Sequence, residues 1–157
     1  MRIDYRNVLP GAMEAMRGLE EIVHASTLEP ELLELVKMRA SQLNGCAYCL
    51  DMHSKDARAR GESEQRLHVL AAWREAPFYT PRERAALEYT EALTLVATEG
   101  VSDALMERVR EHFTDEEIVA LTMAVVAING WNRMMIAFAV PAGNYHPAAH
   151  VEATASV

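Results

Sequence analysis

Both cysteines of the chain and one of its six histidines fall within ten residues, NGCAYCLDMH (44–53). Cys46, Cys49 and His53 follow one another at spacings of three and four, and such positions share one face of an α-helix. A thiol pair with an imidazole one turn away can hold a thiolate, form a reversible disulfide or bind a metal ion. The spacing therefore indicates redox or metal chemistry along one helix face.

The place of the two sulfurs along that helix favours thiol activation. The turn at 44–45, Asn-Gly, ends the preceding helix, so Cys46 begins the next one, where unpaired N–H groups and the helix dipole favour a thiolate. His53 lies one turn beyond Cys49 and could accept that thiol's proton directly or through a water molecule. We expect an activated thiol beside a resolving thiol, with Cys46 at the mouth of the site. Which sulfur has the lower pKa stays open, because the helix start favours Cys46 and His53 favours Cys49.

Other interpretations of the cysteine pair were weighed against this one. A c-type haem needs a histidine directly after the second cysteine, where this chain has Leu50. A disulfide between adjacent turns closes a very small loop and contributes only about 2 kcal/mol, and a thioredoxin-type pair needs a preceding strand. A structural zinc site needs four ligands; Cys46, Cys49 and His53 supply three, so zinc with Glu34 or another histidine stays open, as do two inert buried thiols. The favoured interpretation is a site without metal or cofactor.

A base histidine usually needs a second group that orients it and balances its charge. Glu34 lies on the helix before the 44–45 turn, and in an antiparallel helix pair it would lie about 15 Å below that turn, deeper than His53 at about 10 Å. The apolar periodicity of that helix argues against a buried Glu34, because Leu32 and Val36 mark its apolar stripe and Glu34 points nearly opposite to that stripe. The residues alone leave the role of Glu34 open.

The rest of the chain has the pattern of helices with clear starts and stops. Thr80 with Glu83 and Thr114 with Glu117 each predict a capping box. No segment alternates polar and apolar residues as a strand would, and no glycine-rich phosphate loop is present. We predict one all-α domain, a bundle of about seven helices, over residues 1–157, with its core in about 20–140 and an irregular tail over 141–157. The predicted helices span about residues 11–26, 31–43, 46–60, 63–73, 80–98, 102–112 and 114–140.

Composition limits the function classes. The 157 residues are 50% apolar and 24% charged, with a formal net charge of −8, which is a folded composition without the basic patch that nucleic acids require. The N-terminus lacks the apolar region of a secretory signal, and the longest apolar run, 118–128, is too short to span a bilayer. We expect a cytoplasmic protein that binds neither nucleic acid nor membrane. Because the last helix is apolar on nearly all sides, we also expect a homo-oligomer that buries part of it.

The candidate site residues together resemble a known family. Glu34, eleven intervening residues, the pair Cys46 and Cys49, three intervening residues and His53 match the motif of the alkylhydroperoxidase AhpD-like branch of the carboxymuconolactone decarboxylase superfamily. The likeness covers most of residues 20–140. It extends to two further segments, 81–97 and 128–137.

The resemblance implies an all-helical subunit that assembles as a homotrimer or homohexamer. It also implies peroxide reduction with electrons from a dithiol donor, such as a lipoyl carrier or a thioredoxin-like protein. Cys49 would be the peroxidatic thiol, Cys46 the resolving thiol, His53 the base that activates Cys49, and Glu34 the group behind His53. Characterised members have a second histidine directly before the second cysteine, whereas this chain has Tyr48. Tyr48 can donate a hydrogen bond, but with an ordinary pKa of about 10 it is a poor base at neutral pH.

Two other functions stay open. The pair could belong to a thiol–disulfide adaptor or redox sensor that a partner oxidises and that turns over little peroxide itself. The chain could also be an enzyme like the decarboxylases that name the superfamily, using His53 and Glu34 alone. The cysteine pair argues against that function, because decarboxylation does not need it.

Overall fold

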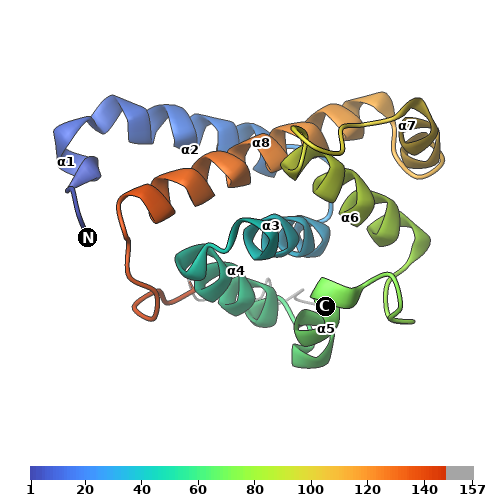
Figure 1. Ribbon diagram of the computed structural model, residues 1–157, viewed down its shortest axis with the longest axis horizontal. Helices are drawn as coiled ribbons and strands as arrows, with labels where there is room; N and C mark the ends of the chain where they lie inside the picture. Colours follow the sequence, from blue (N-terminus) through green and yellow to red (C-terminus); the bar gives the residue numbers. More distant parts are fainter. Residues whose placement is uncertain (148–157) are drawn as a thin grey trace, which may run out of the picture.

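The computed structural model describes residues 1–147, and over this range it is built of α-helices with one short 3-10 turn and no β-strand (Figure 1). The elements are α1 (Tyr5–Val8), α2 (Pro10–His24), α3 (Pro30–Asn44), α4 (Ala47–Ala59), α5 (Glu64–Val69), the 3-10 turn η1 (Leu70–Ala72), α6 (Pro81–Thr94), α7 (Asp103–Arg110) and α8 (Asp115–Ala137). The all-α prediction is confirmed. Residues 141–147 of the predicted irregular tail form no helix, and its remainder, 148–157, lies outside the described residues.

Local signals in the sequence set the helix ends. Both predicted capping boxes form, with the Thr80 side chain accepting from the Glu83 backbone N–H and the Glu83 carboxylate accepting from the Thr80 backbone N–H. The pair Thr114 and Glu117 repeats this arrangement at the start of α8. Gly45 ends α3 with a φ of +67°, a left-handed conformation that favours glycine. The chain therefore reverses sharply between α3 and α4, directly before Cys46.

Helix α3 is the central element of the fold. It packs against α4, α6 and α8, while α2 lies along α8 on the far side of the molecule from α4 (Figure 1). Buried apolar side chains of α3, α6, α7 and α8 make up the main core, among them Val36, Leu121 and Val125. Because neighbours cover α3 on several sides, its polar residues are enclosed along with its apolar ones.

Several predicted boundaries differ from those of the structure. The helix expected over about 46–60 begins at Ala47, with Cys46 as its N-cap, and the last helix ends at Ala137 rather than near residue 140. The segment 63–73 divides into α5 and the 3-10 turn, and the helix expected to reach residue 98 ends at Thr94. The short helix α1 was not predicted. Helix termini depend on packing as well as on capping residues, so shifts of a few residues are expected.

Helix α8 has 23 residues and is long and apolar enough, by length and composition, to cross a membrane, whereas the run 118–128 alone is too short. In the structure 56% of its most apolar window is buried, and it packs against α2, α3 and α6. These contacts make it a core helix of the bundle. Its outward side still exposes Val119, Val126 and Ile136.

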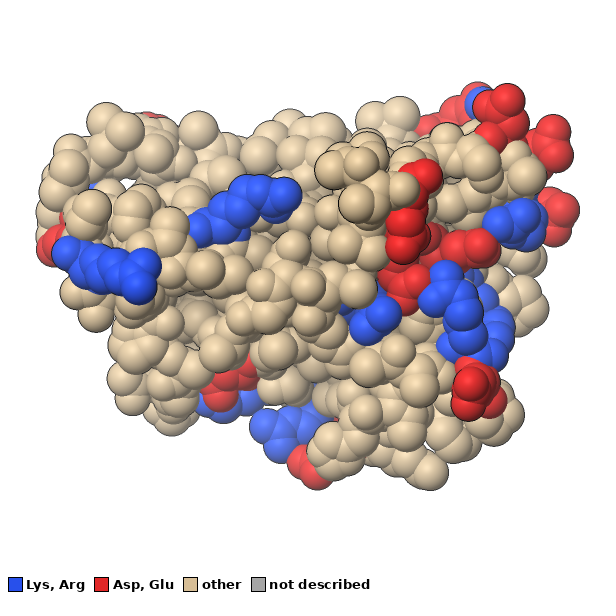
Figure 2. Space-filling model, viewed as in Figure 1, with Lys and Arg blue, Asp and Glu red and all other residues tan. Residues whose placement is uncertain are grey.

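Charged side chains are unevenly distributed over the face drawn in Figure 2. Acidic side chains gather at the end of the molecule where α7 lies, and the basic ones stand singly or beside acidic partners. This face therefore carries no continuous basic stripe of the kind that binds phosphates.

Candidate functional site

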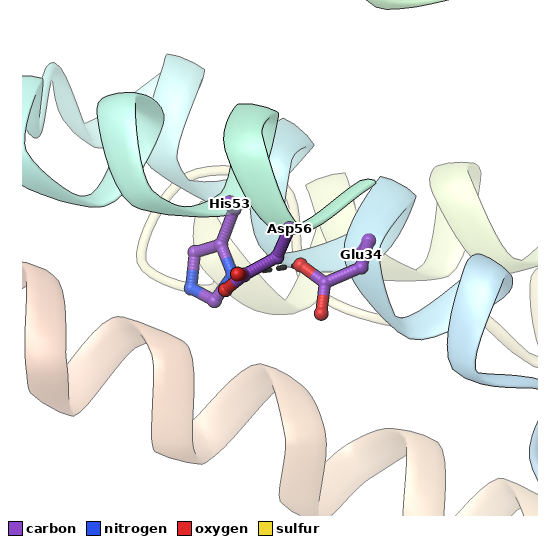
Figure 3. A group of neighbouring side chains, drawn as sticks. All are labelled: Glu34, His53 and Asp56. Atoms are coloured by element: carbon purple, nitrogen blue, oxygen red, sulfur yellow. Dashed lines mark hydrogen bonds and ion pairs between the residues drawn. The ribbon is translucent and has the colours of Figure 1, made fainter. Parts of the chain in front are cut away.

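Helices α3 and α4 bring Glu34 and His53 into contact. Oε2 of Glu34 lies 2.8 Å from Nδ1 of His53, and both side chains are buried (Figure 3). This is the juxtaposition that the motif predicts. The periodicity of α3, which directed Glu34 toward solvent, was a wrong guide, because it assumes a helix with one buried side and α3 is covered on several sides.

The contact favours the ionised form of Glu34 and orients the imidazole of His53. Burial opposes ionisation of Glu34, but the His53 hydrogen bond and the positive charges of Lys37 and Arg60 outweigh it, so the pKa of Glu34 is lowered. An ionised Glu34 accepts the hydrogen of Nδ1, which leaves Nε2 of His53 as an acceptor. The imidazole is thus oriented to take up a proton at Nε2.

The two thiols begin helix α4. Sγ of Cys46, the N-cap residue, accepts the backbone N–H of Cys49 at 3.4 Å. Both cysteines are free thiols and both are 1% exposed. The expectation that Cys46 lies at the mouth of the site was wrong: Cys46 is buried, and of the two cysteines only Cys49 lines the cavity described below.

The two sulfurs share a proton. The Cys49 thiol donates a hydrogen bond to Cys46, and despite burial this bond lowers the pKa of Cys46 to about 7. The same hydrogen bond, burial and the charge on Cys46 raise the pKa of Cys49. The pair therefore loses one proton near neutral pH and holds the other tightly. These shifts favour Cys46 as the more acidic sulfur.

The imidazole and the thiols are near one another without forming one coordination set. Within residues 1–147 the three-residue group whose ligand atoms all lie within 4.8 Å of one another is Glu34, His53 and Asp56 (Figure 3). The set Cys46, Cys49 and His53 does not meet that limit, which argues against the zinc site. In the same part of the chain His53 hydrogen-bonds to Glu34 and not to a sulfur. Proton transfer from Cys49 to Nε2 therefore has no direct hydrogen bond to follow in this part of the structure.

A cavity of about 410 Å³ connects Cys49 to the His53–Glu34 pair. This volume is within the range of sites for small organic molecules. Tyr48 forms part of its wall and, because burial raises its pKa further, stays a protonated hydrogen-bond donor. The cavity is lined by Tyr5, Arg6, Met13, Glu20, His24, Glu34, Lys37, Tyr48, Cys49, Met52, His53, Asp56, Arg60, Trp131, Met135 and Tyr145.

Two lining residues, Asp56 and Tyr145, were missed by the sequence analysis. The Tyr145 hydroxyl donates to Asp56 Oδ1 at 2.7 Å, and burial and this carboxylate raise the pKa of Tyr145. The segment around Tyr145 is also held by Gly143 N–H on Asp51 at 3.0 Å and by Lys55 Nζ on the Tyr145 carbonyl at 3.0 Å. A tail without regular structure thus forms a wall of the cavity, and nothing in its local sequence pattern indicates this.

A third missed residue is Asn132 of α8, which is fully buried. Its Oδ1 accepts from Asn44 Nδ2 at 2.8 Å, and its Nδ2 donates to Ser41 Oγ at 3.0 Å. The available signal was a polar residue on the apolar face of a long helix.

Comparisons with known proteins agree with the fold and the motif. Residues 10–92 match the model of the carboxymuconolactone decarboxylase family. The uncharacterised protein YdfG of Bacillus subtilis is 46% identical over 136 residues, which are 87% of this chain and 92% of YdfG. A crystal structure from Agrobacterium tumefaciens, of a protein of unknown function named as a candidate antioxidant defence protein AhpD, superimposes with a TM-score of 0.87 at 45% identity, covering 90% of this chain and 97% of that one.

The chain belongs to the carboxymuconolactone decarboxylase family. Within that superfamily it is AhpD-like, as its motif predicted. A solved structure from Silicibacter sp. TM1040 that is 25% identical to this chain is named an uncharacterised peroxidase-related protein. The fold also serves other chemistry: the debrominase Bmp8 shares it with a TM-score of 0.76 over 86% of this chain and 73% of Bmp8, at 20% identity.

Proposed function

We propose that this protein is a thiol-dependent hydroperoxidase that reduces peroxides at Cys49 and closes a Cys46–Cys49 disulfide in each cycle. The observation that carries this proposal is the shared cavity, which is lined by one cysteine of the pair, Cys49, and by Glu34 and His53. A peroxide in the cavity can thus meet a thiol and a proton acceptor at once.

The first step is proton transfer out of Cys49. Once the pair has lost one proton, its negative charge is centred on Cys46 and its remaining proton is on Cys49. When that proton moves to Cys46, or through water to Nε2 of His53, Cys49 becomes the thiolate. Its sulfur attacks the terminal peroxide oxygen, an S–O bond forms, the O–O bond breaks, and the leaving alkoxide takes up a proton. The products are an alcohol and a sulfenic acid on Cys49.

The second step closes the disulfide. The Cys46 thiolate attacks the Cys49 sulfur, the S–S bond forms, and hydroxide leaves to become water with one more proton. Cys46 sits next to its target, since its sulfur accepts the Cys49 backbone N–H. A sulfenic acid at Cys49 is therefore trapped before a second peroxide oxidises it.

The burial of Cys46 limits which sulfur of the disulfide a reductant can attack. Because Cys49 lines the cavity and Cys46 does not, a donor thiolate reaches the disulfide at Cys49, releases the Cys46 thiolate, and then forms its own disulfide with its second thiol. A dithiol on a slender arm, such as a lipoyl group, enters a cavity of about 410 Å³ more readily than the folded surface of a thioredoxin-like protein. We therefore favour a lipoyl-type donor.

The proposal includes a cytoplasmic homo-oligomer, a trimer or a hexamer. Its support is the apolar outer side of α8, where Val119 and Val126 are 63% and 49% exposed. A groove beside it, between α6 and α8, is lined by Leu93, Val96, Val125, Val126, Asn129, Gly130 and Arg133. Assembly would remove this apolar surface from water.

The test is peroxide consumption in the presence of a dithiol reductant. We expect turnover in the wild type, none with Cys49→Ser, and slower turnover with Cys46→Ser, whose Cys49 sulfenic acid the dithiol must reduce directly. Absence of thiol-dependent turnover with lipoyl, thioredoxin-like and small dithiol donors would refute the proposal. Activity toward a lactone acid that survives both substitutions would favour a decarboxylase-like enzyme.

The adaptor or sensor is the second candidate. It is favoured by the 1% exposure of both thiols and by the absence, within residues 1–147, of a hydrogen bond between Cys49 and His53. Its signature would be a disulfide that a partner's disulfide forms rapidly while peroxide forms it slowly.

A further inference from the structure

Helix α8 carries a buried side-chain amide, that of Asn132, on the face that packs near the cysteine pair. Ile128 and Met135 of α8 pack in the same apolar cluster as Cys46 and Cys49. Asn132 lies four residues after Ile128 and three before Met135, so the three side chains share one face of the helix. With no exposed surface, Asn132 presents its amide within an otherwise apolar cover over the sulfurs.

Two hydrogen bonds hold that amide in place. Its oxygen accepts from Asn44 Nδ2 at 2.8 Å and its nitrogen donates to Ser41 Oγ at 3.0 Å. Both partners lie in the last turn of α3, and the Ser41 carbonyl also accepts the Cys46 backbone N–H at 3.0 Å. The amide is therefore fixed relative to the turn that carries the thiols.

These two hydrogen bonds leave one N–H donor of the Asn132 amide unused. An amide nitrogen has two N–H donors, and Ser41 takes one of them. In a side chain with no access to water the second donor costs free energy unless it finds an acceptor. Asn132 also lowers the pKa of both Cys46 and Cys49, which makes the two sulfurs the candidate acceptors for the second donor.

We propose that Asn132 is a positioning residue that donates a hydrogen bond to whichever sulfur of the pair carries the negative charge. It rests on the proposed function only in taking the pair to be redox-active. A donor shared by the two sulfurs stabilises the thiolate before and after the proton moves from Cys49 to Cys46. The Asn132 hydrogen bond stabilises only the reduced pair, because a disulfide has no thiolate. Stabilising the reduced form makes the disulfide easier to reduce.

The test measures the thiols directly and needs no peroxide. Asn132→Leu removes the donor at similar volume, and Asn132→Asp keeps the shape and the acceptor for Asn44 but, when ionised, donates nothing. The pH midpoint of thiolate absorbance should rise by about one unit with Asn132→Leu and further with Asn132→Asp. Equilibration with a dithiol should show the disulfide about tenfold harder to reduce, a potential lower by about 30 mV.

Asn129→Leu is the matched control, since Asn129 lies one turn earlier on α8 and accepts from the same Asn44 nitrogen at 3.0 Å. It should leave the thiolate midpoint and the potential unchanged. An unchanged midpoint in a folded Asn132→Leu or Asn132→Asp protein would overturn the inference. So would an equal shift in Asn129→Leu, which would mean a general loosening of the turn. Loss of peroxide turnover in the wild type would refute the proposed function and leave these shifts as they are.

Discussion

Glu34 and His53 stand 19 residues apart in the chain, yet Oε2 of Glu34 lies 2.8 Å from Nδ1 of His53 in the interior of the protein. The bond leaves Nε2 as the free nitrogen of the imidazole. The carboxylate of Glu34 is kept ionised although burial opposes its charge. One buried pair thus both orients the candidate base and holds the charge that the base acquires when it takes a proton.

The first prediction concerns the rate of Cys49 oxidation. His53→Gln removes the acceptor and should slow sulfenic acid formation by about 10²-fold, the lower end of the range for general bases. Glu34→Gln keeps a polar partner without its charge and should have a smaller effect. Rapid-mixing measurements with one equivalent of peroxide report both rates. His68→Gln, an exposed histidine outside the cavity, is the control, and equal rates in His53→Gln and His68→Gln would remove the base role.

The second prediction is the pH dependence of thiol reactivity. Because the pKa of Cys46 is lowered to about 7, the pair should be about one tenth ionised at pH 6 and about nine tenths at pH 8. Peroxide or iodoacetamide reactivity should therefore rise with pH with a midpoint near that value. In Cys46→Ser the shared proton is lost, and the midpoint for Cys49 should move up toward the ordinary thiol pKa of about 8.5. An unchanged pH midpoint of thiol reactivity in Cys46→Ser would contradict the coupling of the two sulfurs.

The third prediction links Glu34 to stability in acid. Its folded-state pKa is lowered, so its ionised form stabilises the protein above the ordinary glutamate pKa of about 4.3, and this contribution is lost as pH falls through the lowered value. Urea unfolding from pH 7 down to pH 3 should show Glu34→Gln less stable than the wild type at pH 7, with the difference shrinking in acid. Glu14→Gln, at an exposed position of α2, should show a constant difference near zero.

The fourth prediction concerns the wall made by the segment 141–147. Tyr145→Phe keeps the ring and removes the donor to Asp56, so the free energy of unfolding should fall by about 1 kcal/mol. Tyr145→Ala also removes the wall and should raise KM for bulky organic hydroperoxides while changing hydrogen peroxide reduction little. The comparison of the two substrates is the measurement. An equal change for both would mean that Tyr145 does not shape the cavity.

The fifth prediction addresses assembly. Val126→Asp puts a charge on the exposed side of α8 and should reduce the particle mass measured by light scattering from that of a trimer or hexamer to that of the 17.5 kDa chain. Val8→Asp, at a 71% exposed valine of α1, should leave the mass unchanged. A wild-type protein that is monomeric at micromolar concentration would contradict the proposed oligomer outright.

The sequence alone was a good guide where the physics is local. The capping boxes at Thr80 and Thr114 and the left-handed Gly45 act within one helical turn, and they formed where the pattern placed them. The shared face of Cys49 and His53 follows from helical spacing in the same way: both are buried on α4. The helix ends predicted least well, after α6 and α8, carry no such signal and depend on what the next segment packs against.

Only the tertiary structure decided the environment of each group. Glu34 is buried because neighbours surround α3, which the one-sided stripe of a single helix does not reveal. Cys49 rather than Cys46 meets the cavity, and Asn132 and Tyr145 join the site from helices and tail about 80 to 100 residues away in sequence. Residue types and spacing determine what chemistry is available. Burial and the partners brought by distant segments determine which sulfur holds the charge, because both act through space rather than along the chain.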